Sequence, residues 1–103
     1  MPKTPRKTPA ELAKPWPTAP SPDIAGERAR LLALNLQAAI DARRRVKSGV
    51  SVRSIADTAD LDEGTIRNIL TGARWPDLRT ITRLEEALDT SLWPVRRSRD
   101  DVR

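Results

Sequence analysis

The spacing of apolar residues divides the middle of the chain into helical segments. A long first helix is expected from about Ile24 to Lys47, with Asp23 as its N-cap, because apolar residues recur there at helical spacing. These residues are Leu32, Leu36, Ala39 and Ile40. Gly49 interrupts the pattern, so we expect the first helix to end before it.

Two short helices follow, separated by a brief interruption at residues 60–62. Ser51 is expected to cap the first of them and Asp62 the second. The inward positions are Val52, Ile55, Ala56 and Ala59 in the first, and Ile66, Ile69 and Leu70 in the second. Gly72 lies where a left-handed residue would end the second helix.

A fourth helix is expected after Pro76, with Asp77 as its cap. Its inner face carries Leu78, Ile81, Leu84 and Leu88. Residues 91–94 have room for at most one further turn, and no strand pattern or internal repeat is present. The expected fold class is therefore all-α, a compact bundle of four to five helices.

The two ends of the chain differ from this middle region. Seven of the nine prolines lie in residues 1–22, among four basic residues and few apolar ones, which predicts a disordered Pro-rich basic arm. Its Trp16 is expected to rest on the nearest apolar surface, with contact to a partner as the alternative. Residues 95–103 are expected to be a charged flexible tail. The remaining residues, 23–94, form the predicted domain.

The charge is unevenly distributed along the chain. Of the net charge of +5, residues 1–22 carry +3 and the residues after 94 carry +2, while residues 23–94 are neutral overall. Basic arms add a salt-sensitive, sequence-independent attraction to phosphate. Because many solvated surfaces have similar charges, the charge alone does not identify a DNA-binding protein.

Several kinds of chemistry lack the residues they require. The chain has no Cys and no His, so disulfides, cysteine-ligated zinc and histidine-dependent catalysis are excluded. Its carboxylates have no spacing typical of an acid–base pair or a metal site. We therefore expect no enzyme, no metal and no cofactor. The sequence shows no signal peptide and no membrane span, so we expect a cytoplasmic, bacterial or phage protein without a membrane partner.

Residues 51–72 read SVRSIADTADLDEGTIRNILTG. Several positions in this segment have the residue types that two helices joined by a tight turn require. Ala56 is a small residue where two helices would cross, Leu61 fills the turn between them, and Gly72 ends the second helix. This segment resembles the helix-turn-helix of the Cro and phage-repressor family, also called the xenobiotic-response-element family. With the following segment ARWPDLRTITRLEEALDTSLWP, the resemblance extends from about Leu36 to Pro94. In the family, the turn position of Asp60 is usually a glycine in the left-handed conformation.

The resemblance implies a lambda-repressor-like fold that binds double-stranded DNA as a sequence-specific transcriptional regulator, a repressor of phage, prophage or antitoxin style. The helix over residues 63–71 would enter the major groove, with Ile66 and Ile69 facing the core. The base-facing residues would be Glu63, Gly64, Thr65, Arg67 and Asn68. A merely solvated polar face is the alternative explanation for them.

Each of these residues has a specific expected contact. Arg67 would bind guanine O6 and N7, Asn68 adenine N6 and N7, and Glu63 cytosine N4. Thr65 would contact a thymine methyl group or a phosphate, and Gly64 would permit close approach to DNA.

Phosphate contacts would come from the start of the second helix and the loop after the recognition helix, where Arg53, Arg74 and Arg79 lie. Trp75 in that loop is expected to cover the core, with contact to the DNA backbone as the alternative.

A homodimer is expected, because one such domain contacts only a few base pairs. Candidate interface residues are Leu92 and Trp93, or Leu31, Leu32 and Leu34 of the first helix. Alternative functions are a protein-interaction adaptor, an antitoxin-like protein whose tail binds a protein partner, and a nonspecific nucleoid-type DNA binder.

Overall fold

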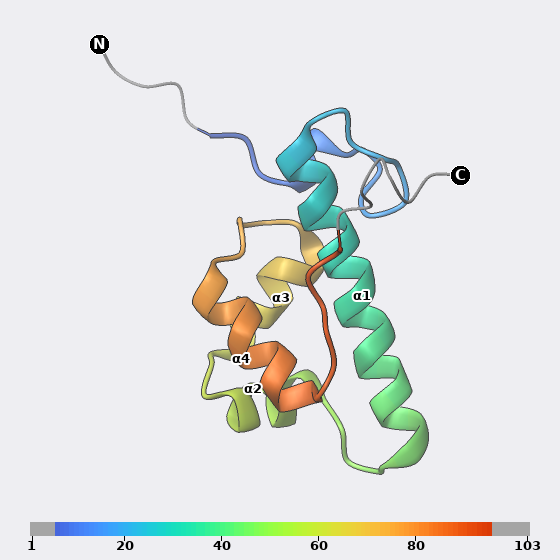
Figure 1. Ribbon diagram of the computed structural model, residues 1–103, viewed down its shortest axis with the longest axis vertical. Helices are drawn as coiled ribbons and strands as arrows, with labels where there is room; N and C mark the ends of the chain where they lie inside the picture. Colours follow the sequence, from blue (N-terminus) through green and yellow to red (C-terminus); the bar gives the residue numbers. More distant parts are fainter. Residues whose placement is uncertain (1–5, 96–103) are drawn as a thin grey trace.

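The structure, a computed structural model that describes residues 6–95, contains four α-helices and one turn of 3₁₀ helix in this range, and no strand (Figure 1). The elements are η1 (Ala10–Leu12), α1 (Ile24–Val46), α2 (Val52–Ala59), α3 (Glu63–Thr71) and α4 (Leu78–Leu88). The expected all-α bundle is therefore confirmed, with four α-helices.

The helix boundaries follow from the capping residues. The Asp23 carboxylate accepts a hydrogen bond from the backbone of α1 at 2.7 Å, and Asp77 does the same for α4 at 2.8 Å. Ser51 and Ser54 form a reciprocal capping box at the start of α2. Asp62 occupies the N-cap position of α3, but its side chain makes no capping hydrogen bond, so the predicted cap at Asp62 is wrong.

The core lies where the long helix α1 packs against α3 and α4, with α2 packed against α3 and α4 in turn. Its centre has no exposed surface and is formed by Leu32, Leu36, Ile40, Ile66 and Leu84. Burial of these side chains is the main stabilising contribution in a chain without disulfides.

The segment after α4 runs back along α1 as an extended chain (Figure 1). The Glu85 carboxylate accepts hydrogen bonds from the backbone N–H groups of Leu92 and Trp93, at 2.7 and 3.1 Å. The Asn35 amide donates to the Leu92 carbonyl at 2.8 Å, and the Leu92 side chain is only 1% exposed. These bonds satisfy the backbone without a helix, so the further turn for which residues 91–94 have room does not form.

Residues 6–22 also pack against the domain, which corrects the expected disordered arm over this range. Pro9 and Ala13 are buried, and the Ala10 N–H donates to the Gly72 carbonyl at 3.0 Å. A segment with few apolar residues is ordered here because its polar groups bond to the end of α3. Residues 1–5, and the predicted flexible tail beyond residue 95, lie outside the described residues.

Candidate nucleic-acid interface

The turn between α2 and α3 is held in a single geometry by its own backbone and by α4. Asp60 adopts the left-handed conformation, with φ 56° and ψ 51°, and the Leu61 N–H donates to the Ala56 carbonyl at 2.9 Å. Arg83 of α4 donates to both the carbonyl and the carboxylate of Asp60, at 3.3 and 3.1 Å. This ionic brace supports a non-glycine residue in a conformation that normally favours glycine.

The outward face of α3 is set by burial of its two isoleucines. Ile66 is fully buried and Ile69 is 4% exposed. The five predicted base-facing residues all retain exposed surface: Gly64 and Arg67 are exposed, and Glu63, Thr65 and Asn68 are partly exposed. The structure therefore brings these five residues together on one helix face.

Arg67 and Glu63 on this face form an ion pair. The Arg67 Nε donates to Glu63 Oε2 at 3.0 Å, and Nη2 donates to the same oxygen. The pair follows from i,i+4 spacing, which places the two side chains one above the other on a helix. Because both bonds go to one oxygen, Oε1 of Glu63 and Nη1 of Arg67 make no side-chain hydrogen bond within residues 6–95.

The second half of the face borders the loop that follows α3. Thr65, Asn68 and Arg74 line one surface hollow together with Trp75. Trp75 is half-buried, and its indole Nε1 donates to the Lys7 carbonyl at 2.8 Å. Its polar edge is thus occupied by the N-terminal segment, a contact that neither sequence-based alternative for Trp75 anticipated.

The three predicted phosphate-binding arginines are exposed, but their surroundings differ. Arg53 lies in the first turn of α2 and Arg74 in the loop after α3, whereas Arg79 shares a hollow with Asp60, Asp62 and Asp77. The pKa of Asp77 is lowered, first by the hydrogen bond from the Thr80 N–H and then, to a smaller degree, by the Arg79 charge. Arg79 therefore lies near three carboxylates in the free protein, but it takes part in none of the ion pairs found within residues 6–95.

Residues 42–92, about half of the chain, match a protein family described as helix-turn-helix, of the Cro and C1 type. The matched region contains α2, the turn at Asp60, α3 and α4. The chain belongs to this helix-turn-helix family. No curated protein and no solved structure gives a significant match.

Membership assigns α2 and α3 as the two helices of the motif, with α3 in the position of the recognition helix. The helix-turn-helix family consists of DNA-binding regulators and is not normally enzymatic. No helix in residues 6–95 combines the length and the apolar character needed to cross a membrane.

Two contacts were not identified from the sequence. Arg83 braces the turn, and Trp16, which was expected to rest on the nearest apolar surface, packs on the domain at the end of α3, where its indole N–H donates to the Leu70 carbonyl. Both contacts join residues far apart in the sequence, so periodicity and capping signals could not find them. The only local indication was the isolated Trp16 between two prolines.

Proposed function

We propose that the protein is a sequence-specific transcriptional regulator, a repressor, that inserts α3 into the major groove of double-stranded DNA. The observation that carries this proposal is the outward face of α3, which presents the five small or polar residues and no exposed apolar side chain. In a helix-turn-helix domain this face meets the base edges. We take residues 23–94 as the DNA-binding domain and place the protein in the bacterial cytoplasm, on the nucleoid.

Arg67 is the principal base-reading residue in this proposal. Its pair with Glu63 occupies Nε and one N–H of Nη2 and keeps the side chain over the helix face. Nη1 and the second N–H of Nη2 form the end of the guanidinium that can approach guanine O6 and N7. Glu63 acts either by holding Arg67 or by accepting a hydrogen bond from cytosine N4. Both uses keep these two residues at neighbouring base pairs.

The other contacts extend along the same face. Asn68 is assigned to adenine, Thr65 to a thymine methyl group or a phosphate, and Gly64 to close backbone approach. The phosphate contacts are assigned to Arg53 and Arg74, with Arg79 as a third. Phosphate contacts fix the register of the domain and carry no sequence information themselves.

A homodimer completes the proposal, because two recognition helices are needed to bind two half-sites. Leu92 and Leu32, two of the candidate interface residues, are buried in the core, whereas Trp93 is 44% exposed. Trp93 borders a mainly apolar hollow with Leu78, which is 79% exposed. We assign the dimer interface to this surface, since burial of apolar side chains drives association.

The test is selection from a random duplex library with the full-length protein at near-physiological salt, followed by sequencing. We expect enrichment of one motif with two half-sites about ten base pairs apart. Arg67→Gln should lose one guanine preference, whereas Arg45→Gln, a matched change on the exposed surface of α1, should keep the motif.

Absence of enrichment with folded protein would overturn the proposal and favour an adaptor or antitoxin-like role. Retention of the same motif by Arg67→Gln would overturn the assignment of Arg67.

A further inference from the structure

Residues 6–22, which we call the strap, lie outside the region that matches the family and are bound to the C-terminal end of α3. The Trp16 indole donates to the Leu70 carbonyl at 2.8 Å, and the Ala10 N–H donates to the Gly72 carbonyl at 3.0 Å. The last carbonyls of a helix have no partner within the helix. The strap supplies partners at this end of the recognition helix.

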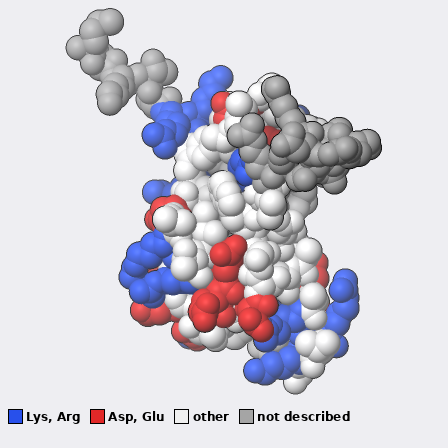
Figure 2. All heavy atoms as spheres, in the orientation of Figure 1, with Lys and Arg blue, Asp and Glu red and all other residues white. Residues whose placement is uncertain are grey.

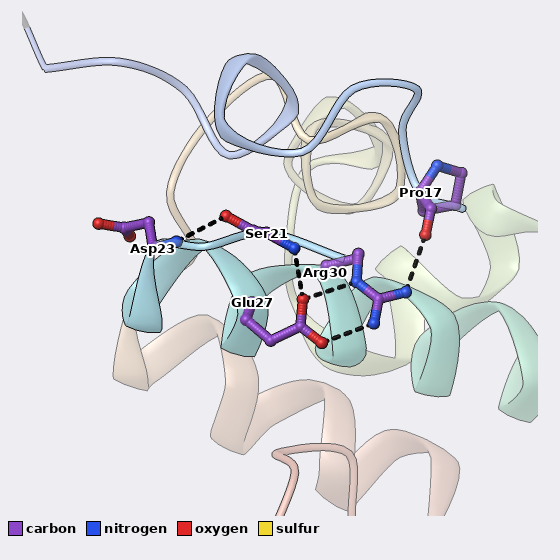
Figure 3. A network of polar contacts seen from close by, with 5 residues as sticks. All are labelled: Pro17, Ser21, Asp23, Glu27 and Arg30. Atoms are coloured by element: carbon purple, nitrogen blue, oxygen red, sulfur yellow. Dashed lines mark hydrogen bonds and ion pairs between the residues drawn. The ribbon is translucent and has the colours of Figure 1, made fainter. Parts of the chain in front are cut away.

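A second set of bonds ties the other end of the strap to α1 (Figure 3). Glu27 accepts hydrogen bonds from the Ser21 N–H at 2.8 Å and from two nitrogens of Arg30, at 2.8 and 2.6 Å. Arg30 in turn donates to the Pro17 carbonyl at 3.1 Å. The strap is thus fixed at both ends, and its path past α3 is determined.

The first residues of the strap lie beside the loop that follows α3. The Lys7 carbonyl accepts the hydrogen bond from Trp75, the neighbour of Arg74, so Lys7 and the preceding Arg6 lie next to that loop. All three basic side chains are exposed, and none of them takes part in the ion pairs found within residues 6–95. Figure 2 shows basic side chains where the described chain begins.

The acidic residue of the strap, Glu11, forms its hydrogen bonds within the strap. The Glu11 carboxylate accepts a hydrogen bond from the Thr8 N–H at 3.0 Å, and the hydrogen bonds of Thr8 are the main cause of its lowered pKa, with smaller contributions from Lys14 and Lys7. Glu11 therefore stays ionised and bonded within the strap. Its charge offsets part of the positive charge of the strap. Arg6 forms no ion pair within the described residues.

We propose that the docked strap is a second DNA-contacting element, in which Arg6 and Lys7 join Arg74 in binding the phosphates that flank the base pairs contacted by α3. Three exposed cations at the end of a recognition helix complement the phosphate backbone in charge. This inference rests on the proposed function. It adds to that function a segment that the helix-turn-helix match does not include.

The first experiment measures the dependence of log K on log salt concentration for Arg6→Gln/Lys7→Gln on the selected duplex and on a random duplex. Each phosphate contact contributes about 0.9 to the slope, so we expect the slope to fall by up to about 1.8, equally on both duplexes. Arg45→Gln/Lys47→Gln is the control for net charge. These residues lie at the C-terminal end of α1, whereas the strap is bound near its N-terminal end (Figure 1).

A change no larger than that of the control pair would overturn the proposal while leaving the proposed function intact. Failure of the wild-type protein to bind duplex DNA would overturn both.

The second experiment separates a docked strap from a loose basic arm. Trp16→Ala keeps every charge and removes the side chain that contacts Leu70. We expect the Ala10 amide to lose its protection from hydrogen exchange and the salt slope to fall to the value of Arg6→Gln/Lys7→Gln, with helix content retained. A wild-type slope together with an exchanging Ala10 amide would show that docking is not needed, and would overturn the proposal.

Discussion

The indole Nε1 of Trp16 lies 2.8 Å from the carbonyl oxygen of Leu70, 54 residues further along the chain. The ring covers Gly72, where an added Cβ would lie 2.7 Å from the nearest ring carbon and 2.9 Å from the Ala10 nitrogen. Gly72 also has a φ of 69°. This glycine therefore meets two separate requirements: it ends α3, and it admits the strap.

Gly72→Ala should destabilise the fold more than Gly49→Ala does, although both glycines have positive φ. At Gly49, with φ 79°, no described atom lies within 4 Å of an added Cβ, so only the backbone cost of about 1 kcal/mol applies. At Gly72 the clash with Trp16 adds about 1–3 kcal/mol, because the strap must shift. Urea unfolding followed by circular dichroism measures both. Equal destabilisation would show that the strap does not press on Gly72.

Gly64→Ala should affect stability and DNA binding in opposite directions. Gly64 lies in the first turn of α3, and no atom of residues 6–95 is within 4 Å of a Cβ built there. Alanine should therefore stabilise the fold by about 0.5 kcal/mol through helix propensity. Binding to the selected duplex should weaken, because in the proposed complex the added methyl group faces the DNA. Thermal unfolding and a binding titration test the two effects, and unchanged affinity would contradict close approach of the backbone.

Lowering the pH should release the strap between about pH 4.5 and pH 2. The pKa of Glu27 is lowered to about 2, first by its hydrogen bonds from Arg30 and then by the Ser21 N–H. An unfolded glutamate titrates near pH 4.3. The stabilisation is therefore present above that pH and is lost as the pH falls through the folded value.

Fluorescence of Trp16, compared with that of a Trp16→Phe variant, follows this release. Glu27→Gln is the control and should show a loosened strap at neutral pH with a weaker acid transition. An unchanged acid transition in Glu27→Gln would assign it to another group.

Two leucine truncations should show how firmly the extended C-terminal segment is anchored. Leu92 is 1% exposed and Leu78 is 79% exposed. Leu92→Ala should cost about 2–4 kcal/mol, whereas Leu78→Ala should stay within about 0.5 kcal/mol in the monomer. Chemical unfolding at low protein concentration measures both. A small effect at Leu92 would mean that residues 89–95 contribute little to the core.

Glu63→Gln should test the ion pair on α3. The pair is exposed, so its loss should change the stability by no more than about 0.5 kcal/mol. The guanine preference at the Arg67 position should fall, because the guanidinium loses its ionic support. Binding to duplexes that differ at one base pair measures the preference. If the lost preference is instead for cytosine at a neighbouring position, Glu63 itself contacts a base.

Local signals made most of the domain predictable from the sequence. Asp23, Ser51 and Asp77 cap their helices because capping depends on residues only a few positions apart. The outward face of α3 followed from the spacing of Ile66 and Ile69 for the same reason.

The strap was not predictable in this way. Its proline-rich composition has no periodicity, and its order depends on carbonyls at the end of α3 that no local pattern reveals. The brace between Arg83 and Asp60 is likewise a contact between distant parts of the chain. Asp62 shows the opposite failure, since a residue type suited to capping occupies the position without making the bond.

The Arg28 guanidinium donates a hydrogen bond to the Pro94 carbonyl at 2.9 Å. It brings the end of the described chain to the first turns of α1, where Glu27 also holds Ser21 of the strap. The strap and the C-terminal end of the described chain are thus tied to the same pole of the long helix. At the opposite pole, in the turn around Gly49, no described atom lies within 4 Å of a Cβ added to this glycine. A label or peptide inserted there would least disturb the contacts of the strap and of Pro94 with α1 (Figure 1).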